Sequence, residues 1–327
     1  MTDGEDDWKP TCRIEVLKHR AIAFAAVRQF FDQLGYVEVE TPLLSGDTVV
    51  DAYIDPIAAA TTPPRFLQTS PEAAMKRLLS AGMNSCYQIT KAFRAGETGR
   101  LHNPEFTIIE WYGLGTTWEQ QIQLTERLVR SVRQALHDSI PTDCFSQPFS
   151  RVTYQSAFER IGITGVLDKS AAQLGQLVLD RLPEYSSDNL PDNRDDLLNM
   201  LLSDLVEPEL GIGTAEFLTS YPLSQAALAE VNHDDPRTAC RFELYHEGIE
   251  LCNGYHELVD PAELRMREQQ QNNLRSVTLP GAGRLSAAMK SGLPACAGVA
   301  LGFDRLMMCL LGAEHIREVI AFPFERA

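Results

Sequence analysis

The chain has 327 residues with 45 acidic and 29 basic side chains, a formal net charge of −16 and a hydrophobic fraction of 44%. This composition suffices for one large core or two modest ones, and the acidic excess argues against a protein that coats nucleic acid. No apolar run approaches the ~20 residues of a membrane span. The seven cysteines include no Cys-X-X-Cys pair, so neither a disulfide framework nor a structural zinc site is indicated. We expect a soluble protein of the reducing cytoplasm, with no membrane partner.

The first segments alternate between helix and strand signals. Apolar residues recur from Glu15 to Leu34 with the spacing of an amphipathic helix, which Gly35 ends. A strand is predicted over 36–41, where Pro42 stops it, and a loop with one short strand is predicted over 47–64.

A second helix is predicted after a short strand over 65–69. Ser70 has the chemistry of an N-cap, Pro71 suits the first helical position, and Glu72 in the first turn interacts favourably with the helix dipole.

A basic loop follows the next predicted strand, 86–93. Lys91, Arg94 and Arg100 accompany a single acid, Glu97, so the local charge is near +2 in an acidic protein. This reversal of charge indicates an anion site.

The strand after this loop carries two polar groups where a core strand has none. A period of two places Phe106, Ile108, Glu110 and Tyr112 on one face. A carboxylate is costly to bury without a partner, and a bound cationic or hydroxyl-bearing ligand would supply one. The alternative is an edge strand with Glu110 in solvent.

A long helix is predicted over 118–136, and several short helices separated by Gly and Pro are predicted over 152–210. No internal repeat or low-complexity tract is present.

The segment 241–257 has the pattern of a hairpin. A tight turn at 246–248 would place Glu243 opposite Glu250, and two opposed carboxylates invite a divalent cation such as Mg²⁺. The alternative is a solvated hairpin with a slipped register.

The second strand of this hairpin carries a further polar set. Asn253, Tyr255 and Glu257 have the opposite parity to Glu250, so both sets reach one pocket only if a bulge lies near Cys252.

The C-terminal segment, 298–327, is predicted as strand, helix and strand. Asp304 is the expected N-cap, and Arg305 would then lie in the first helical turn, where the helix dipole disfavours a cation. An anionic ligand would reverse that preference. A salt bridge to a nearby carboxylate is the alternative.

Three of these segments together resemble the motifs of a known family. YVEVETP, FRAGETGRLHNPEFTIIEWY and GVALGFDRLMMCLLG with EVIAFP are similar to motifs 1, 2 and 3 of the class II aminoacyl-tRNA synthetase catalytic core, the lysyl enzyme in particular. The resemblance implies an α+β fold, an antiparallel sheet flanked by helices, with motif 1 forming a homodimer interface. It also implies that ATP activates an amino acid as its aminoacyl-adenylate.

The resemblance implies a domain plan as well. We expect a flexible tail over 1–14 and one catalytic domain over 15–327, with a helical insertion at about 113–240. The anticodon-binding domain that precedes motif 1 in lysyl-tRNA synthetases is expected to be missing.

By resemblance, the nucleotide is assigned to Arg94, Ala95, Gly96, His102, Asn103, Phe106, Glu243, Glu250, Leu251, Gly302 and Arg305. Arg94 and Arg305 are the catalytic candidates among them, Phe106 is expected to stack on adenine, and Glu243 with Glu250 is expected to hold Mg²⁺. The amino-acid pocket is assigned to Ser70, Pro71, Glu72, Glu110, Tyr112, Asn253, Tyr255, Glu257 and Ala300. The substrate's side-chain ammonium is expected between Glu110 and Glu257.

Two further departures from the lysyl enzyme point to a related family. Ala300 stands where the synthetase usually has glycine, and Gly96-Glu97 replaces an acid followed by glycine. One added methyl changes discrimination by roughly 1 to 3 kcal/mol, which favours a substrate whose amine lies one carbon further along. Drift on a tolerant strand is the alternative.

These features resemble the elongation factor P lysine ligases. We therefore predict ATP-dependent activation of (R)-β-lysine, or lysine, and its transfer to a lysine ε-amine of elongation factor P, with tRNA not expected as a partner. The alternatives are a truncated synthetase that charges tRNA or another small acceptor, and a silent paralogue that acts as a regulatory subunit. The preference between α- and β-lysine, the general base, the acceptor surface and the role of the insertion stay open.

Overall fold

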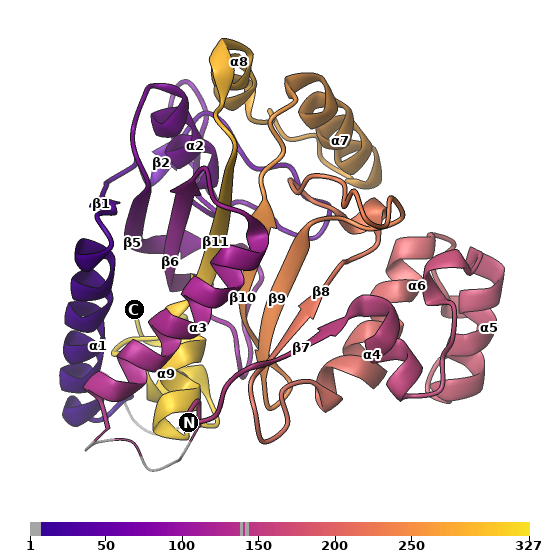
Figure 1. Cartoon of the computed structure of the whole chain (residues 1–327), viewed down its shortest axis with the longest axis horizontal. Helices are drawn as coiled ribbons and strands as arrows, with labels where there is room; N and C mark the ends of the chain where they lie inside the picture. The colour runs from indigo at the N-terminus through magenta and orange to yellow at the C-terminus, as the bar shows by residue number, and fades with distance from the viewer. Residues whose placement is uncertain (1–7, 138–139, 141–143) are drawn as a thin grey trace. The chain divides into compact units, whose positions relative to one another are not determined.

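A computed structural model describes residues 8–137, 140 and 144–327. Contacts within the chain divide it into a first unit, Met1–Ser146 with His256–Ala327, and a second unit, Gln147–Tyr255 (Figure 1). In the described residues, no helix has both the length and the apolar character needed to cross a membrane.

The first unit contains α1 (Ile14–Gln33), β1 (Val37–Glu38), β2 (Leu44–Ser45), β3 (Ala58–Ala59), β4 (Arg65–Leu67), α2 (Glu72–Ser80), β5 (Cys86–Phe93), β6 (Glu105–Leu114), α3 (Trp118–Ala135), α7 (Pro261–Leu274), α8 (Gly283–Gly292), β11 (Cys296–Gly302) and α9 (Phe303–Leu311), with short 3-10 turns at Ile316–Glu318 and Phe324–Arg326. Its main strands follow the order β1, β5, β6, β11. The pair β1 and β5 is parallel, and β6 runs antiparallel to both β5 and β11. A small second sheet has the order β2, β4, β3.

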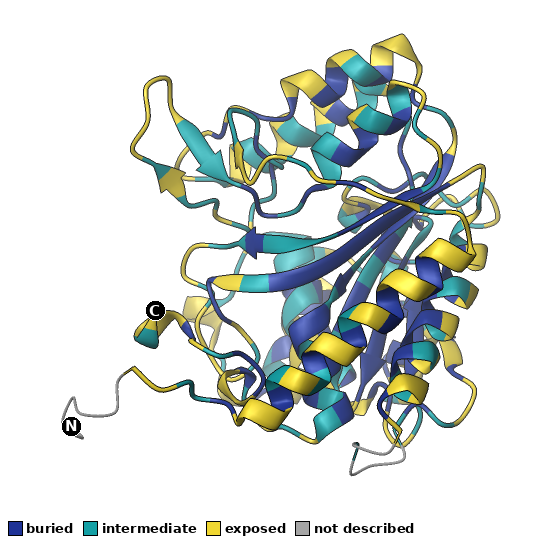
Figure 2. Cartoon of the chain, turned by 90° about the vertical axis from the view of Figure 1, so that its left-hand side faces the viewer, coloured by how far each residue is buried: buried dark blue, intermediate teal, exposed yellow. Residues whose placement is uncertain are grey.

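The back of the first unit's main sheet is packed by helices. Phe31 of α1 stacks on Tyr87 of β5 with ring centroids 4.5 Å apart and lies 5.4 Å from Trp111 of β6. The Trp111 indole donates a hydrogen bond of 2.7 Å to Gln121 of α3. Figure 2 shows the flanking helices exposed along their outer stripe and buried toward the strands. This is the ordinary packing face that the alternation of β6 predicts, which leaves its other face for a site.

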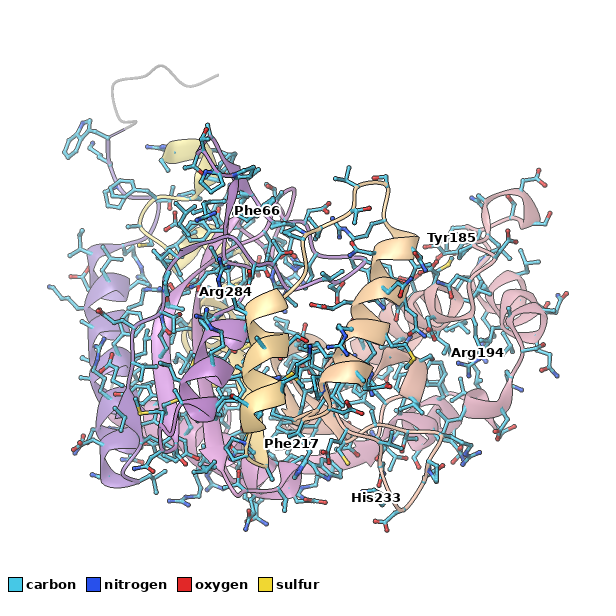
Figure 3. All side chains as sticks on the ribbon, turned by 90° about the horizontal axis from the view of Figure 1, so that it is seen from above. Phe66, Tyr185, Arg194, Phe217, His233 and Arg284 are labelled. Carbon is cyan, nitrogen blue, oxygen red and sulfur yellow. The ribbon has the colours of Figure 1, made fainter. Side chains whose placement is uncertain are left out.

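Two contacts between segments that are far apart in the sequence hold loops of the first unit in place. On α8, Arg284 (labelled in Figure 3) forms an ion pair of 2.5 Å with Asp47, and its backbone N–H donates to the same carboxylate. The Thr11 hydroxyl donates to the carbonyl of Arg317 at 2.8 Å. Of the tail predicted over 1–14, residues 1–7 lie outside the described residues.

The second unit contains β7 (Ser150–Thr153), α4 (Tyr154–Arg160), α5 (Ala171–Arg181), α6 (Arg194–Leu201), β8 (Glu216–Thr219), β9 (Arg241–His246) and β10 (Ile249–His256), whose last residue belongs to the first unit, with short turns at Val166–Asp168, Ser187–Asn189, Leu202–Val206, Glu207–Glu209 and Leu223–Gln225. Its strands follow the order β10, β9, β8, β7, with β7 and β8 parallel and the other pairs antiparallel.

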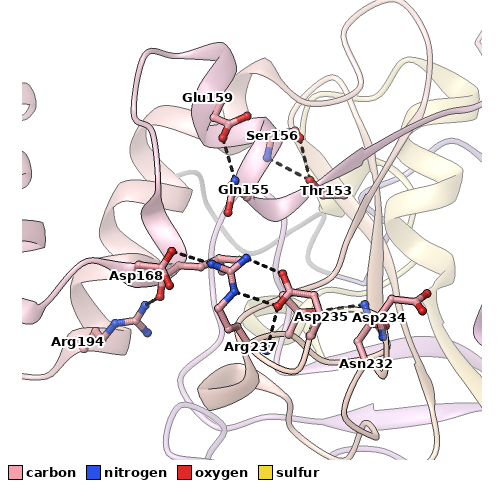
Figure 4. A network of polar contacts seen from close by, with 12 residues as sticks. Thr153, Gln155, Ser156, Glu159, Asp168, Arg194, Asn232, Asp234, Asp235 and Arg237 are labelled. Carbon is pink, nitrogen blue, oxygen red and sulfur yellow. Dashed lines mark hydrogen bonds and ion pairs between the residues drawn. The ribbon is translucent and has the colours of Figure 1, made fainter.

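The helices of the second unit enclose their own core, which includes Tyr154, Phe158 and Leu198. The predicted run of short helices over 152–210 is confirmed. At its surface, Arg237 forms ion pairs of 2.7 Å with both Asp168 and Asp235 (Figure 4). β7 and β8 were not predicted, because each is only four residues long.

Two other boundaries differ from the predictions. The strand expected over 36–41 pairs only at Val37 and Glu38. The second strand expected in the C-terminal segment does not form; the described chain there has 3-10 turns at Ile316–Glu318 and Phe324–Arg326 instead. Five to six apolar residues in a row do not distinguish a strand from a buried turn without a pairing partner. The prediction of an α+β fold with a mainly antiparallel sheet flanked by helices is confirmed.

Candidate active site

One face of the first unit's sheet collects the polar side chains. β11 runs beside β6 with Ala300 opposite Glu110 and Gly298 opposite Tyr112. Directly opposed residues project from the same face of a sheet. A small residue therefore stands beside each of these two polar side chains, both of which are buried.

Three glutamates and one lysine converge at this face, and we call Glu72, Lys76, Glu110 and Glu257 the carboxylate cluster. The side chains of Lys76 and Glu257 are both 1% exposed, and that of Glu72 is 12% exposed. Lys76 Nζ lies 2.6 Å from Glu72 Oε1 and forms a second ion pair with Glu257 Oε2. A single ammonium thus joins a carboxylate on α2 to one just beyond β10.

Glu110 is held by hydroxyl groups. It accepts hydrogen bonds from the Tyr112 hydroxyl at 2.6 Å and from the Ser70 hydroxyl at 2.8 Å. The Ser70 oxygen also accepts from the backbone N–H of Glu72 at 3.0 Å. The predicted cap of α2 is nevertheless wrong by one residue, because Pro71 is the N-cap and the helix begins at Glu72. Glu110 is only 2% exposed and lies on a strand with neighbours on both sides, so the alternative of an edge strand with this carboxylate in solvent is wrong.

Lys76 was missed in the sequence, although the position held a signal. Glu72 and Lys76 are four residues apart on one helix, the spacing of a favourable pair, and the neighbouring Met75 and Leu79 are buried. A lysine between such neighbours points into the protein. The substrate's ammonium was expected between Glu110 and Glu257, and the structure adds that Lys76 already contacts Glu257.

Burial has the largest single effect on the pKa values of the carboxylate cluster. Burial, followed by the charge of Glu72, raises the pKa of Glu110 to about 7 despite the hydrogen bonds from Tyr112 and Ser70. Burial also raises the pKa of Glu257 to about 8, and Lys76 opposes this rise. For Lys76, burial lowers the pKa, but Glu257 and Glu72 outweigh it and the net pKa is raised. The lysine is therefore charged, whereas the pKa values of Glu110 and Glu257 are both raised into the neutral range.

Gly298 closes the pocket on the β11 side. A Cβ atom at this position would lie 2.4 Å from Cε1 of Tyr112 and 2.5 Å from Oε1 of Glu257. Real Cβ atoms do not approach so closely. The small residues at 298, 300 and 302 recur with the period of a strand, which is the signal in the sequence that could have identified this wall.

A second group of charges lies where the basic loop meets α9, and we call Arg94, His102 and Arg305 the cationic cluster. Arg305 Nη2 lies 2.6 Å from His102 Nε2, and Arg305 Nε donates to the Leu101 carbonyl at 3.4 Å. Burial, followed by the nearby Arg305 guanidinium, lowers the pKa of His102, and Arg94 acts in the same direction. A histidine whose pKa is lowered by burial and by two guanidinium groups marks a place of positive potential.

Phe106 lies at the start of β6 beneath Arg94, whose guanidinium is 5.0 Å from the centre of the ring. Arg94 also forms a loose ion pair of 3.6 Å with Glu97. The loop between them is held by the Ala95 N–H, which donates to the Asp55 carbonyl at 2.8 Å. Gly96 has a φ of 77°, a left-handed conformation that favours glycine. The exchange of acid and glycine noted at 96–97 thus places glycine where the turn requires it.

Asn103 is buried, and both ends of its amide are engaged. Its nitrogen donates to the Glu105 carbonyl at 2.7 Å, and its oxygen accepts from the Phe324 N–H at 2.9 Å. Its observed contacts therefore hold the basic loop to the C-terminal segment.

The predicted cap of α9 is wrong. The helix begins at Phe303 with Gly302 as N-cap, and Asp304 lies within the first turn. Asp304 accepts a hydrogen bond of 2.7 Å from the Thr107 N–H and forms an ion pair of 2.6 Å with Arg20 of α1. Arg305 nevertheless lies in the first turn, as predicted.

The hairpin of the second unit has a different register from the one predicted. Glu250 pairs with Tyr245 and Glu243 pairs with Asn253, so the two glutamates are not directly opposed. The register shifts between Glu250 and Cys252, where Leu251 forms the bulge that the sequence required. Because paired residues share a face, Glu243, Glu250 and Asn253 all project from the same side.

Glu243 is enclosed by donors. Arg241 lies 2.6 Å from its Oε1, and the hydroxyl of Tyr245 donates to its Oε2 at 2.6 Å. The hydroxyl of Tyr221 donates to the same oxygen. Two carboxylates on one face have the hard oxygen donors that suit Mg²⁺. A metal bound at Glu243 would take the place of Arg241 at that carboxylate.

On the same face, the Arg241 guanidinium lies 5.9 Å from the centre of the Tyr255 ring. The side-chain oxygen of Asn253 is buried without a hydrogen-bond partner among the described residues. A buried acceptor of this kind is costly unless a ligand or water supplies a donor.

Comparison with known proteins identifies the chain's relatives. Residues 9–326 match the family model of class II tRNA synthetases (D, K and N). The chain is 44% identical to an elongation factor P–(R)-β-lysine ligase of Vibrio vulnificus, over 97% of this chain and 98% of the relative. It is 42% identical to the ligase of that name from Vibrio cholerae (98% and 99% covered) and 40% identical to that of Klebsiella pneumoniae (98% and 98%). The chain therefore belongs to the class II tRNA synthetases of the D, K and N group and, within it, to the family of the elongation factor P–(R)-β-lysine ligases.

Proposed function

We propose that this chain is an ATP-dependent ligase that activates (R)-β-lysine, or lysine, as the aminoacyl-adenylate and joins it to a lysine ε-amine of elongation factor P. Relatives named elongation factor P–(R)-β-lysine ligases match the chain along almost their whole length, which supports the proposal.

The observation that carries the proposal is the placement of opposite charges along one strand. Arg94 of the cationic cluster lies over Phe106 at the start of β6, and Glu110 of the carboxylate cluster lies further along the same face. Four residues of strand span roughly 13 Å. An elongated molecule with a phosphate at one end and an amine at the other fits this separation.

In the first step, the amino-acid carboxylate attacks the α-phosphate of ATP, and pyrophosphate leaves. Arg94 and Arg305 neutralise the charge that builds on the phosphates, and Phe106 supports the adenine ring. The carboxylate cluster orients the amino acid through its amines. Fixed charges and positioning then supply the catalysis, with no nucleophile from the protein.

In the second step, the deprotonated ε-amine of the acceptor attacks the adenylate carbonyl. The new C–N amide bond forms as the C–O bond to AMP breaks. Burial of the carboxylate cluster keeps water from the amine end of the substrate.

We propose Glu243 and Glu250 as ligands of Mg²⁺, which supplies charge neutralisation at the phosphates when bound. Leu251 at the bulge sets their common face, and Gly302 allows close approach of the nucleotide. Asn253 and Tyr255 are proposed to contact the amino acid.

We also propose a homodimer formed through the motif 1 region. Ile22, Leu34, Val37, Leu43 and Leu44 are exposed large hydrophobic residues in α1 and the segment after it. Their exposure supports the proposal, since large exposed apolar areas are typical of interaction surfaces. Sedimentation analysis of Val37→Asp with Leu43→Asp is expected to give a monomer, and an unchanged dimer would contradict this assignment.

The function is tested in two stages. Pyrophosphate exchange with α-lysine and with (R)-β-lysine measures activation, and transfer of the labelled amino acid to elongation factor P or to tRNA identifies the acceptor. We expect exchange and transfer to the factor. Transfer to tRNA alone would favour a tRNA-charging enzyme, and no exchange with either amino acid would favour a silent paralogue.

A further inference from the structure

Lys76 is the least expected member of the carboxylate cluster. Its side chain is 1% exposed, and it approaches Tyr112 as well, with Nζ 5.9 Å from the ring centre. A lysine is almost never buried so completely unless it is paired. Two carboxylates, Glu72 and Glu257, pair with it here.

The charges of the cluster do not balance. Three carboxyl groups accompany one ammonium, so full ionisation leaves two negative charges in a largely buried cluster. Lys76 contacts Glu72 and Glu257, whereas Glu110 has hydroxyl partners only. Within the cluster, Glu110 is therefore the carboxyl group whose charge an incoming cation would restore.

We propose that Lys76 is a positioning residue for amino-acid selection, whose ammonium fixes the separation of Glu72 and Glu257 and leaves the place beside Glu110 to a substrate amine. The inference rests on the proposed function, since it assigns the cluster to the amino acid. The ligand class is a diamino acid, whose two ammonium groups meet carboxylates that Lys76 has already arranged.

Geometry supports this role beyond simple neutralisation. Glu72 is carried by α2, while Glu257 follows β10 and is held by its N–H, which donates to the Cys296 carbonyl at 3.0 Å. Two like charges on separate elements repel in a buried site, and Lys76 Nζ lies between them. Without an ammonium, the pair would share a proton or move apart.

The test compares Lys76→Met with the matched control Lys290→Met, which changes an exposed lysine at the end of α8. In Lys76→Met we expect KM for the amino acid to rise about 100-fold, because the charge-assisted contacts of the ammonium with Glu72 and Glu257 are lost. KM for ATP should stay within about threefold of the wild-type value. A purely structural role would raise both KM values and lower stability together.

Calorimetry in two buffers of different ionisation enthalpy counts the protons released when the amino acid binds. In Lys76→Met we expect about one more proton than in the wild type, because two buried carboxylates without an ammonium hold a proton between them. An unchanged proton count with an unchanged amino-acid KM would overturn the proposal.

Lys76→Arg keeps the positive charge, so it tests the positioning role even if the methionine variant does not fold. The guanidinium is larger and planar, so we expect amino-acid KM to rise about tenfold and the ratio of α- to β-lysine activation to change. Wild-type behaviour of Lys76→Arg would overturn the positioning role. If the wild-type enzyme binds neither diamino acid, the proposed function itself fails, which is a different result from equal binding by wild type and variant.

Discussion

The cationic and carboxylate clusters lie in the same unit but differ in how deeply their charged side chains are buried. Arg94 and its partner Glu97 are 27% and 25% exposed and lie on a loop, while Lys76 and Glu257 are each 1% exposed and lie against the sheet. Half-buried cations of this kind keep part of their hydration. Buried carboxylates must be fixed in advance, since an unpaired buried charge is too costly. The carboxylate cluster therefore depends more strongly on exact pairing than the cationic cluster does.

The largest effect is expected at the cationic cluster. Arg94→Ala or Arg305→Ala should lower kcat/KM for pyrophosphate exchange by about 10²- to 10³-fold, because each removes a fixed charge at the phosphates. Arg151→Ala, an exposed arginine of β7, serves as control. An equal fall in amino-acid affinity would break the comparison between the two clusters.

Glu110→Gln tests the carboxylate cluster. The amide keeps partners for Tyr112 and Ser70 but loses the charge, so we expect amino-acid binding to weaken by about 1.5–3 kcal/mol with ATP binding unchanged. Steady-state KM values for the two substrates measure this. Glu105→Gln, an exposed carboxylate of the same strand, should have no effect on either.

Gly298→Ala asks how rigid the pocket is. The new methyl would meet Tyr112 and Glu257 at 2.4 and 2.5 Å, so we expect a loss of about 1–3 kcal/mol in the free energy of unfolding and weaker amino-acid binding. Denaturant titration measures the first effect. Gly283→Ala is the control, since no atom lies within 4 Å of its added Cβ. Full tolerance of Gly298→Ala would show that the pocket adjusts.

The pH dependence of amino-acid binding provides a subtler test. Glu110 has a pKa raised to about 7, so it is protonated at lower pH and must lose that proton to hold an ammonium group. The contribution of Glu110 to the amino-acid KM should therefore rise by up to about tenfold for each pH unit below 7, while Glu257, whose pKa is raised to about 8, titrates above it. KM profiles in the wild type and in Glu110→Gln check this, and a profile that Glu110→Gln leaves unchanged would assign the dependence to another group.

The smallest effect is expected at Ala300, which stands opposite Glu110 on β11. Ala300→Gly removes one methyl from the pocket wall and should shift preference toward α-lysine by about tenfold, within the range for one methyl in a packed site. The ratio of pyrophosphate-exchange rates with the two amino acids measures the shift. An unchanged ratio would remove Ala300 from the selection of substrate.

Much of the fold followed from local patterns. The predicted helices 15–34 and 118–136 correspond to Ile14–Gln33 and Trp118–Ala135, and the predicted strand 86–93 matches Cys86–Phe93. The alternation of β6 also predicted which of its faces would be packed. These features depend on periodicity within about 20 residues, which the chain displays directly.

The contact partners of the polar side chains were predicted less accurately from the sequence. The pairing of Glu243 was wrong because the turn was placed wrongly and the bulge at Leu251 then moved the register again. Asp304 was taken for a helix cap, but it lies in the first turn and pairs with Arg20.

By itself the sequence determined the helices, most strands, the acidic character of the chain and the segments that carry its motifs, because these depend on neighbours along the chain. Only the tertiary structure decided that Lys76 joins Glu72 to Glu257 and that hydroxyl groups hold Glu110. Such contacts join residues from separate elements, and their strength depends on burial, which no local pattern measures.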